Sequence, residues 1–391
     1  MPHPIQEIFK RAYSAYEKKR QLPQHVLEAA HKIISCRTAL LGGHLQSCPD
    51  SHFHRVWYNS CKHRMCPQCS FIRIQEWLEK QKARILNCDH YHVIFTIPQE
   101  LRVVWHANSK LLTGILFTCA RDTIFELLED PKRIGGKPGI IAALHTWTKT
   151  LVLHPHIHCL VTGGGLSSSN LWVPLKGSYL FPYAAARAKF RSKVRTELIK
   201  STDKQKLILP DNMTAQQFKN LLNKLGRKKW NVKICEKYSH GEGILVYLAR
   251  YLRGGPISGS RIIHFDDKSV TFNYGRKKRE LMTLSPEKFI SRFLQHVPRS
   301  HAILVRSYGI YSNSKKEQLD ICREQLGQAK VTVNEPKTWQ DYFPTDDKDP
   351  HLCPVCNKEL INTRTFIPKP KMDLADIGPQ HGTIFKQSPP G

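Results

Sequence analysis

Acidic side chains are scarce in this sequence. Asp and Glu together number 32 against 60 Lys and Arg, which leaves a formal net charge of +28 at pH 7. A surface this positive repels itself unless a polyanion neutralises it. The composition therefore favours nucleic acid as the main partner.

Long apolar runs are also missing. The longest apolar stretches, such as residues 111–117, are too short to cross a bilayer, and no basic amphipathic helix is evident. These absences argue against a membrane partner. The first residues contain no basic stretch followed by an apolar run, so we expect no secretory signal and a cytoplasmic location.

Twelve cysteines need an explanation other than disulfides in a compartment that keeps thiols reduced. Cys66 and Cys69 have the two-residue gap with which two thiolates hold one tetrahedral Zn²⁺. Upstream residues could complete a structural zinc site. These candidates are Cys61 and Cys48, together with His52 or His54, while Cys36 is either a further ligand or a buried thiol.

Cys353 and Cys356 repeat the spacing near the C-terminus and indicate a second zinc site. Its partners are less evident, and Cys322 and His351 are the candidates. The remaining cysteines are most simply small core residues.

Residues 151–162 carry the most informative pattern. Side chains alternate between the two faces of a strand, so His156 and His158 point the same way while Ile157 faces the core. Two imidazoles on one face can chelate a divalent cation. Residues 139–147 are expected to form the other strand of an antiparallel hairpin, and they offer His145 as a third ligand. His154 lies on the same face as the pair and is the alternative.

Tyr247 and Tyr251 lie four residues apart in a segment with helical periodicity, residues 242–252, which places both phenols on one helix face. Arg250 and Arg253 add cations that could hold phosphates. A phenol can attack phosphorus if the phosphoryl oxygens are polarised, which a cation held by the histidines could do.

Two basic clusters complete the pattern. Lys228 and Lys229 precede Trp230, and Arg276 and Lys277 follow an aromatic residue. Cations beside an aromatic ring suit single-stranded DNA, where phosphates need positive charge and bases need stacking platforms.

Taken together, these motifs resemble the two-tyrosine HUH transposases of bacterial rolling-circle insertion sequences, the insertion sequence 91 type. The likeness is strongest in Leu153-His-Pro-His-Ile-His-Cys-Leu-Val-Thr-Gly-Gly-Gly165 and Tyr247-Leu-Ala-Arg-Tyr251. Further matching motifs follow in a consistent order at residues 37–44, 58–69, 91–98, 144–147, 289–297 and 305–309.

The resemblance implies nicking of single-stranded DNA at the element ends with Mg²⁺ or Mn²⁺, a 5′-phosphotyrosine intermediate, and strand transfer into a target. It places the metal-binding pair at His156 and His158 and the two nucleophiles at Tyr247 and Tyr251. It also implies a bacterial protein associated with the nucleoid. A plasmid replication initiator or relaxase would use the same chemistry. A zinc hydrolase would use water instead of tyrosine as the nucleophile. A non-catalytic zinc-dependent DNA-binding protein would need neither His156 nor Tyr247.

We therefore expect an α+β protein with a central antiparallel sheet of the HUH nuclease type, flanked by helices. Residues 1–88 should form a helical, zinc-binding and DNA-binding module, and residues 89–280 the nuclease domain. Residues 281–366 should form a small accessory region, followed by a disordered tail at 367–391.

Overall fold

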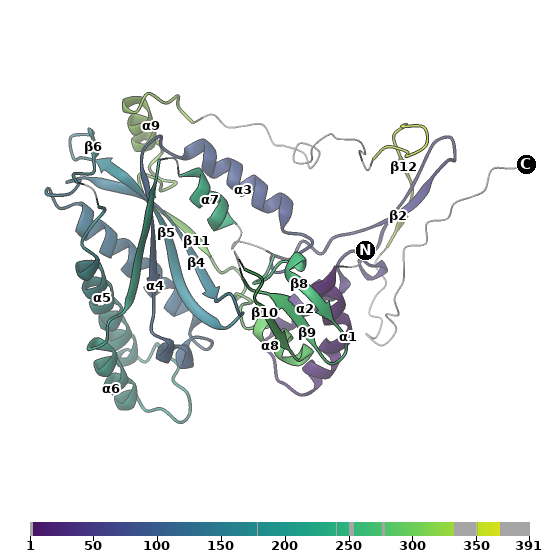
Figure 1. The fold of residues 1–391 in the computed structure, drawn as a ribbon, viewed down its shortest axis with the longest axis horizontal. Coiled ribbons are helices and arrows are strands. Elements are labelled where there is room, and N and C mark those ends of the chain that lie inside the picture. The colour runs from purple at the N-terminus through teal and green to yellow at the C-terminus, as the bar shows by residue number, and fades with distance from the viewer. Residues whose placement is uncertain are drawn as a thin grey trace, which may run out of the picture. The chain divides into compact units, whose positions relative to one another are not determined.

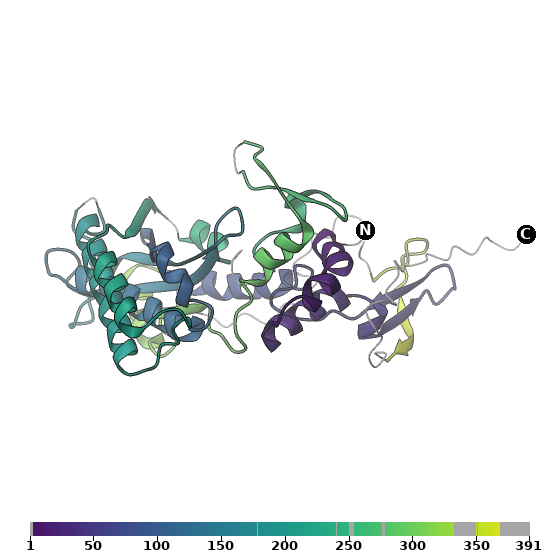
Figure 2. The same ribbon diagram turned by 90° about the horizontal axis from the view of Figure 1, so that it is seen from below.

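The computed structural model describes residues 3–177, 179–239, 241–249, 254–275, 278–331, 349 and 351–367. The chain divides into two compact units, whose elements are labelled in Figure 1 and seen from below in Figure 2. One unit contains residues 1–75, 253–297 and 335–391, and the other contains residues 76–252 and 298–334. In the described part of the chain, no helix is both long enough and apolar enough to cross a membrane.

An antiparallel sheet forms the centre of the second unit. Its order within the described residues is β11–β4–β5–β3–β7, with β6 paired to β5. The predicted hairpin of residues 139–147 and 151–162 is the β4–β5 pair. The strands are β3 (His90–Thr96), β4 (Lys137–Trp147), β5 (Leu153–Leu166), β6 (Trp172–Pro174), β7 (Asn231–Tyr238) and β11 (Val305–Gly309). The sheet and its helices confirm the predicted α+β class.

One face of this sheet carries the apolar core. Phe95 of β3 packs its ring against Phe190, with centroids 4.8 Å apart, and Phe190 also contacts the ring of Trp230. Burial of such aromatic and aliphatic side chains is the main term that stabilises the unit. The covering helices are α4 (Ser109–Leu128), α5 (Tyr183–Asp203) and α6 (Ala215–Gly226), of which α5 and α6 run side by side in Figure 1.

The opposite face carries histidines. His156 and His158 of β5 alternate with core residues, and β3 places His90 and His92 on the same side. Helix α7 (Glu242–Ala249) begins beside this face. Gly241 lies close to the His90 ring, since a Cβ added to this glycine would lie 3.0 Å from that ring. It also contacts β5. The sheet thus separates an apolar helical layer from a polar face.

A 3₁₀ turn (Gln99–Val104) precedes α4, and the chain bends between them. The Asn108 amide donates to the carbonyls of Val104 and Ile208 and accepts from the Ile208 amide, so it takes over bonds that a continuous helix would make within itself.

The first unit contains helices and two small sheets. α1 (Pro4–Lys18) packs on α2 (Gln24–Ser35) and on α8 (Pro286–Leu294), where Phe9 and Phe293 meet edge to face at 5.3 Å. One sheet consists of β8 (Ile262–Phe265), β9 (Val270–Asn273) and β10 (Leu281–Leu284). The other consists of β1 (Gly43–Ser47), β2 (His54–Tyr58) and β12 (Ile361–Phe366). The sequence boundary between the units falls within α3 (Phe71–Arg84), and α9 (Lys316–Gln325) belongs to the second unit.

β10 extends the β8–β9 hairpin, and the C-terminal β12 pairs with β1. The expected disordered tail, residues 367–391, lies outside the described residues except for Ile367.

Gly309 makes a testable contribution to the sheet. Its φ of 60° disfavours side chains, and a Cβ there would overlap the carbonyl oxygen of Pro138 on the neighbouring strand. We expect Gly309→Ala to lower the free energy of unfolding by about 1–3 kcal/mol, measured by urea denaturation. Gly114→Ala is the control, because Gly114 lies in α4 with open space around it. Equal stability of Gly309→Ala and wild type would contradict the argument.

Candidate metal centre and tyrosine helix

The pairing of β4 with β5 sets the geometry of the histidine cluster. His145 lies directly opposite His156, and Ala143 lies opposite His158. The register shifts just beyond His145, where the two strands approach their turn. Because directly paired residues of antiparallel strands share a face, the three histidines come together on the polar side of the sheet.

Three ring nitrogens face one another in this cluster. His145 Nδ1 lies 3.0 Å from His156 Nε2 and 3.3 Å from His158 Nε2, and all three residues are buried. Ligands about 2.1 Å from an octahedral cation lie about 3 Å apart when they are adjacent. Burial lowers the pKa of His156 to about 4, which keeps its ring in the neutral form that binds metals. The donor set therefore fits a divalent cation.

The outward-facing nitrogens of the pair are also occupied. His156 Nδ1 donates to the backbone carbonyl of His154, at 2.5 Å, which leaves the Nε2 lone pair pointing into the cluster. His158 Nδ1 lies 2.8 Å from His92 Nε2. The His154 side chain itself is not in the cluster, and its Nδ1 lies 3.2 Å from the Arg102 guanidinium.

His92 is the residue of this site that sequence reasoning missed. It lies on β3 opposite Leu160, and its ring stacks on that of His158 with centroids 5.0 Å apart. Burial lowers its pKa to about 4, so a neutral ring can accept the proton of His158 Nδ1. The strand pattern of residues 91–98 could have pointed to His92, because it places this residue on one face of a strand. It does not indicate which strand lies beside it.

The predicted nucleophiles belong to the segment around α7. Tyr247 lies within this helix, whose Leu245 and Leu248 are buried. The Tyr247 side chain lies outside the described residues, as do Tyr251, Arg250 and Arg253. The helix that bears Tyr247 contacts the strand that carries His156 and His158.

The basic clusters differ from their prediction in one respect. Trp230 is only 2% exposed, and its indole N–H donates to the carbonyl of Leu225, so its ring is a core element and no platform for bases. Lys228 is paired with Glu100, and Lys229 is exposed. Arg276 and Lys277 lie outside the described residues.

A cluster of four thiols lies in the first unit. Cys36, Cys61, Cys66 and Cys69 come together, with Sγ–Sγ distances of 3.3 Å from Cys36 to Cys69 and 3.7 Å from Cys61 to Cys69. Thiolates around a tetrahedral Zn²⁺ lie about 3.8 Å apart. The neighbouring thiols of Cys36, Cys61 and Cys66 lower the pKa of Cys69 by hydrogen bonding, which favours the thiolate that zinc requires.

The predicted ligand sets are distributed differently in the structure. Cys36, which the sequence left as either a zinc ligand or a buried thiol, is in the four-thiol cluster. Cys48 and His52 lie instead with Cys353 and Cys356, and His54 Nδ1 bonds the Ser47 hydroxyl. Cys322 and His351 are in neither group. Sequence spacing could not show this grouping, because β1 pairs with a strand more than 300 residues away.

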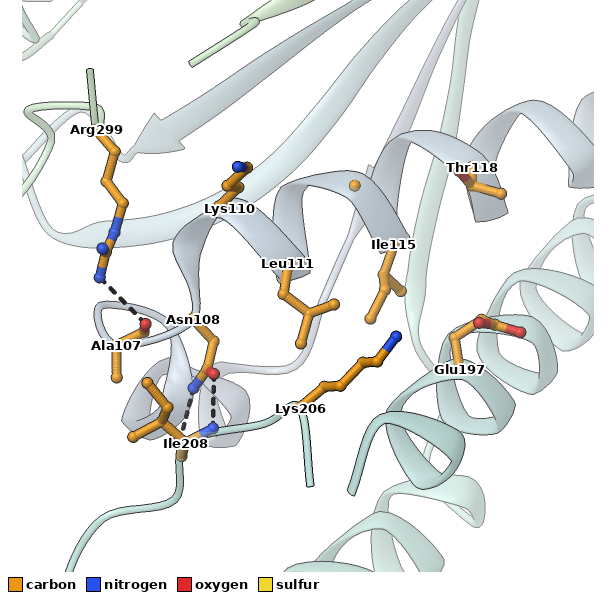
Figure 3. A pocket seen from close by; sticks show the side chains of 11 residues that line it. Ala107, Asn108, Lys110, Leu111, Ile115, Thr118, Glu197, Lys206, Ile208 and Arg299 are labelled. Carbon is orange, nitrogen blue, oxygen red and sulfur yellow. Dashed lines mark hydrogen bonds between the residues drawn. The ribbon is translucent and has the colours of Figure 1, made fainter. Parts of the chain in front are cut away.

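Two open pockets of the second unit lie apart from the cluster. One, of about 810 Å³, is lined by α4 and nearby residues such as Asn108 and Arg299, which are bonded within the chain (Figure 3). The other, of about 780 Å³, borders the first turn of α7 and is lined by Lys82 and Lys237 among others. Neither contains a member of the histidine cluster.

Comparisons with known proteins match both functional regions. The family model described as "Transposase zinc-binding domain" matches residues 8–97, and the one described as "Putative transposase" matches residues 139–318. The chain is 32% identical to the "Putative transposase y4qJ" of Sinorhizobium fredii, over 93% of this chain and 95% of that protein. It is 28% identical to the "Transposase for insertion sequence element IS801" of Pseudomonas savastanoi pv. phaseolicola, over 93% and 90% respectively. No solved structure matches the chain significantly.

The first matched region contains the four-thiol cluster, and the second contains the histidine cluster and α7. The matches over both regions identify the chain as a transposase, a class of DNA-processing enzyme. The chain belongs to the IS91 family of insertion-sequence transposases, as the resemblance implied.

The role of His92 can be tested without a DNA substrate. We expect His92→Leu to weaken Mn²⁺ binding at least about tenfold, because His158 would lose the group that orients its ring. His92→Gln should restore part of the affinity, since its amide oxygen can accept the same hydrogen bond. Isothermal titration of the folded variants with Mn²⁺ measures this, and unchanged affinity in His92→Leu would show that His92 only packs.

Proposed function

We propose that this transposase nicks single-stranded DNA at the ends of its insertion sequence through a tyrosine and transfers the strand to a target by a rolling-circle route. The observation that carries the proposal is the buried cluster of His145, His156 and His158, together with the contact between β5 and the helix that bears Tyr247. Either element alone is common in proteins. Together they are proposed to supply a cation site and a nucleophile for one reaction.

A divalent cation held by the three histidines would polarise the non-bridging oxygens of the scissile phosphate. Imidazole nitrogens suit transition metals better than Mg²⁺, and the described cluster contains no carboxylate, so Mn²⁺ fits this donor set better. The protein's part is to keep these rings neutral and oriented. His156 is oriented by the His154 carbonyl and His158 by His92.

The proposed chemistry exchanges one phosphoester for another. The phenolate oxygen of Tyr247 or Tyr251 attacks phosphorus, and the bond from phosphorus to the 3′ oxygen breaks. The leaving strand takes up a proton as its 3′-hydroxyl, and the 5′-phosphate stays on the tyrosine. A later attack by a 3′-hydroxyl reverses the exchange and needs no external energy source.

Two tyrosines would allow two strand exchanges within one site. Their four-residue spacing puts both phenols on the same side of a helix. One can hold the first DNA end while the second attacks the next junction. Arg250 and Arg253 are proposed to hold the flanking phosphates.

The charge of the chain supports DNA as its partner. The net charge of +28 favours phosphate contacts over a long stretch of strand, and Lys228, Lys229, Arg276 and Lys277 are proposed among them. We also propose the domain organisation expected from the sequence. Residues 1–88 would form the DNA-binding module, residues 89–280 the nuclease domain and residues 281–366 an accessory region. We propose that the protein acts in the bacterial cytoplasm, at the nucleoid.

A covalent-adduct assay tests the proposed chemistry. The protein is incubated with Mn²⁺ and labelled single-stranded DNA that spans an element end, then resolved on a denaturing gel. We expect a labelled protein band that is lost in the Tyr247→Phe/Tyr251→Phe double variant, because no phenol remains to attack. The single variants then identify the first nucleophile.

Two matched controls make the assay specific. Tyr238→Phe removes an exposed phenol on β7 and should retain the adduct. His156→Ala should lower adduct formation at least about a hundredfold, whereas His154→Ala keeps the backbone carbonyl that bonds His156 and should remain active. Cleavage without an adduct would identify water as the nucleophile. Binding of a true element end without cleavage would identify a DNA-binding protein only.

A further inference from the structure

The four-residue group formed by Cys48, His52, Cys353 and Cys356 joins two distant parts of the chain. β1 ends at Ser47, directly before Cys48, and β12 begins at Ile361, shortly after Cys356. The two strands are antiparallel, with Ser47 opposite Ile361. Their pairing therefore brings the loop after β1 to the turn before β12.

The C-terminal pair lies in a tight turn that presents both thiols. The amide of Asn357 donates to the Cys353 carbonyl, and the Cys353 amide donates to the carbonyl of Lys358. Asn357 has a φ of 57°, which such turns use to reverse the chain. A Cys-x-x-Cys turn of this kind places two sulfurs on one side for a metal.

The distances within the group fit one tetrahedral ion. Cys48 Sγ lies 3.4 Å from Cys356 Sγ and 3.8 Å from His52 Nδ1, and all four ligand atoms lie within 4.8 Å of one another. Ligands at zinc–sulfur and zinc–nitrogen bond lengths lie about 3.5–3.8 Å apart in a tetrahedron. Three thiolates and one imidazole select zinc over Mg²⁺ or Mn²⁺.

Apolar burial around the group is small. The cluster consists of Cys48, Cys353 and Leu360, with Phe53 and Cys356 packed against it. β12 itself is largely exposed. The ion pair of Lys358 with Asp50 is solvent-exposed and contributes little. Small modules of this type are usually fastened by a metal.

We propose that Cys48, His52, Cys353 and Cys356 bind a second structural zinc ion, which fastens residues 351–367 to the strand β1. Cys353 and Cys356 lie outside residues 8–97, the part matched by the zinc-binding family model. The site makes the C-terminal segment a part of the zinc-binding module. It does not depend on the proposed nuclease chemistry, because the histidine cluster belongs to the other unit.

Zinc content tests this site directly. The full chain carries His156→Ala and His158→Ala, so that the histidine cluster retains no zinc, and metal is measured by plasma mass spectrometry after dialysis. We expect about two zinc ions per chain, one from each thiol cluster. His52→Ala should lower this to about one, and His52→Cys should restore it, because a thiolate can replace the imidazole. His52 is exposed, so these substitutions should not prevent folding.

His54→Ala is the matched control. It lies two residues from His52 but bonds Ser47, so it should leave the zinc content unchanged. Hydrogen exchange adds a second readout, since the amides of β12 should exchange faster in His52→Ala than in His54→Ala. Unchanged zinc in both His52→Ala and Cys356→Ser would overturn the site. A Cys48–Cys356 disulfide in the purified protein, or zinc loss without faster exchange in β12, would overturn the fastening role.

Discussion

The register between β4 and β5 is the constraint on which the candidate site depends. It places His145 opposite His156 and, through strand alternation, puts Ile157 in the core. A slip of one residue would turn His156 and His158 into the apolar layer and Ile157 onto the polar face. Burying two imidazoles there would cost several kcal/mol. The apolar face therefore selects the register, and the register assembles the three nitrogens.

The first unit depends on a different kind of constraint. Its sheets are short, and the sheet of β1, β2 and β12 has little apolar cover. Two groups of thiols take the place of a larger core, and each draws on residues far apart in the sequence. With zinc in both groups, as we propose, metal binding and folding of this unit would be one equilibrium. The second unit has a large apolar core, so its fold does not depend on the cation site that we propose for catalysis.

Local patterns in the sequence predicted the sheet, the hairpin and the histidine face, because strand alternation and hairpin pairing act over short distances. They did not predict which of the candidate zinc ligands lie together. Cys48 and His52 lie closer in sequence to Cys66, yet β12 brings Cys353 and Cys356 to them. Trp230 shows the same limit: its neighbouring lysines resemble a DNA-binding surface, but tertiary packing against Phe190 buries its ring. His92 escaped notice because its partner is on another strand.

We propose that three histidines on one sheet face hold a catalytic cation. Pulsed electron paramagnetic resonance of the Mn²⁺-loaded protein tests it most directly, because couplings to ¹⁴N report imidazole ligands on the metal itself. We expect such couplings in the wild-type protein and their loss when His145, His156 and His158 are all replaced by Ala. Mn²⁺ bound without nitrogen coupling, or coupling that survives all three substitutions, would contradict this binding mode.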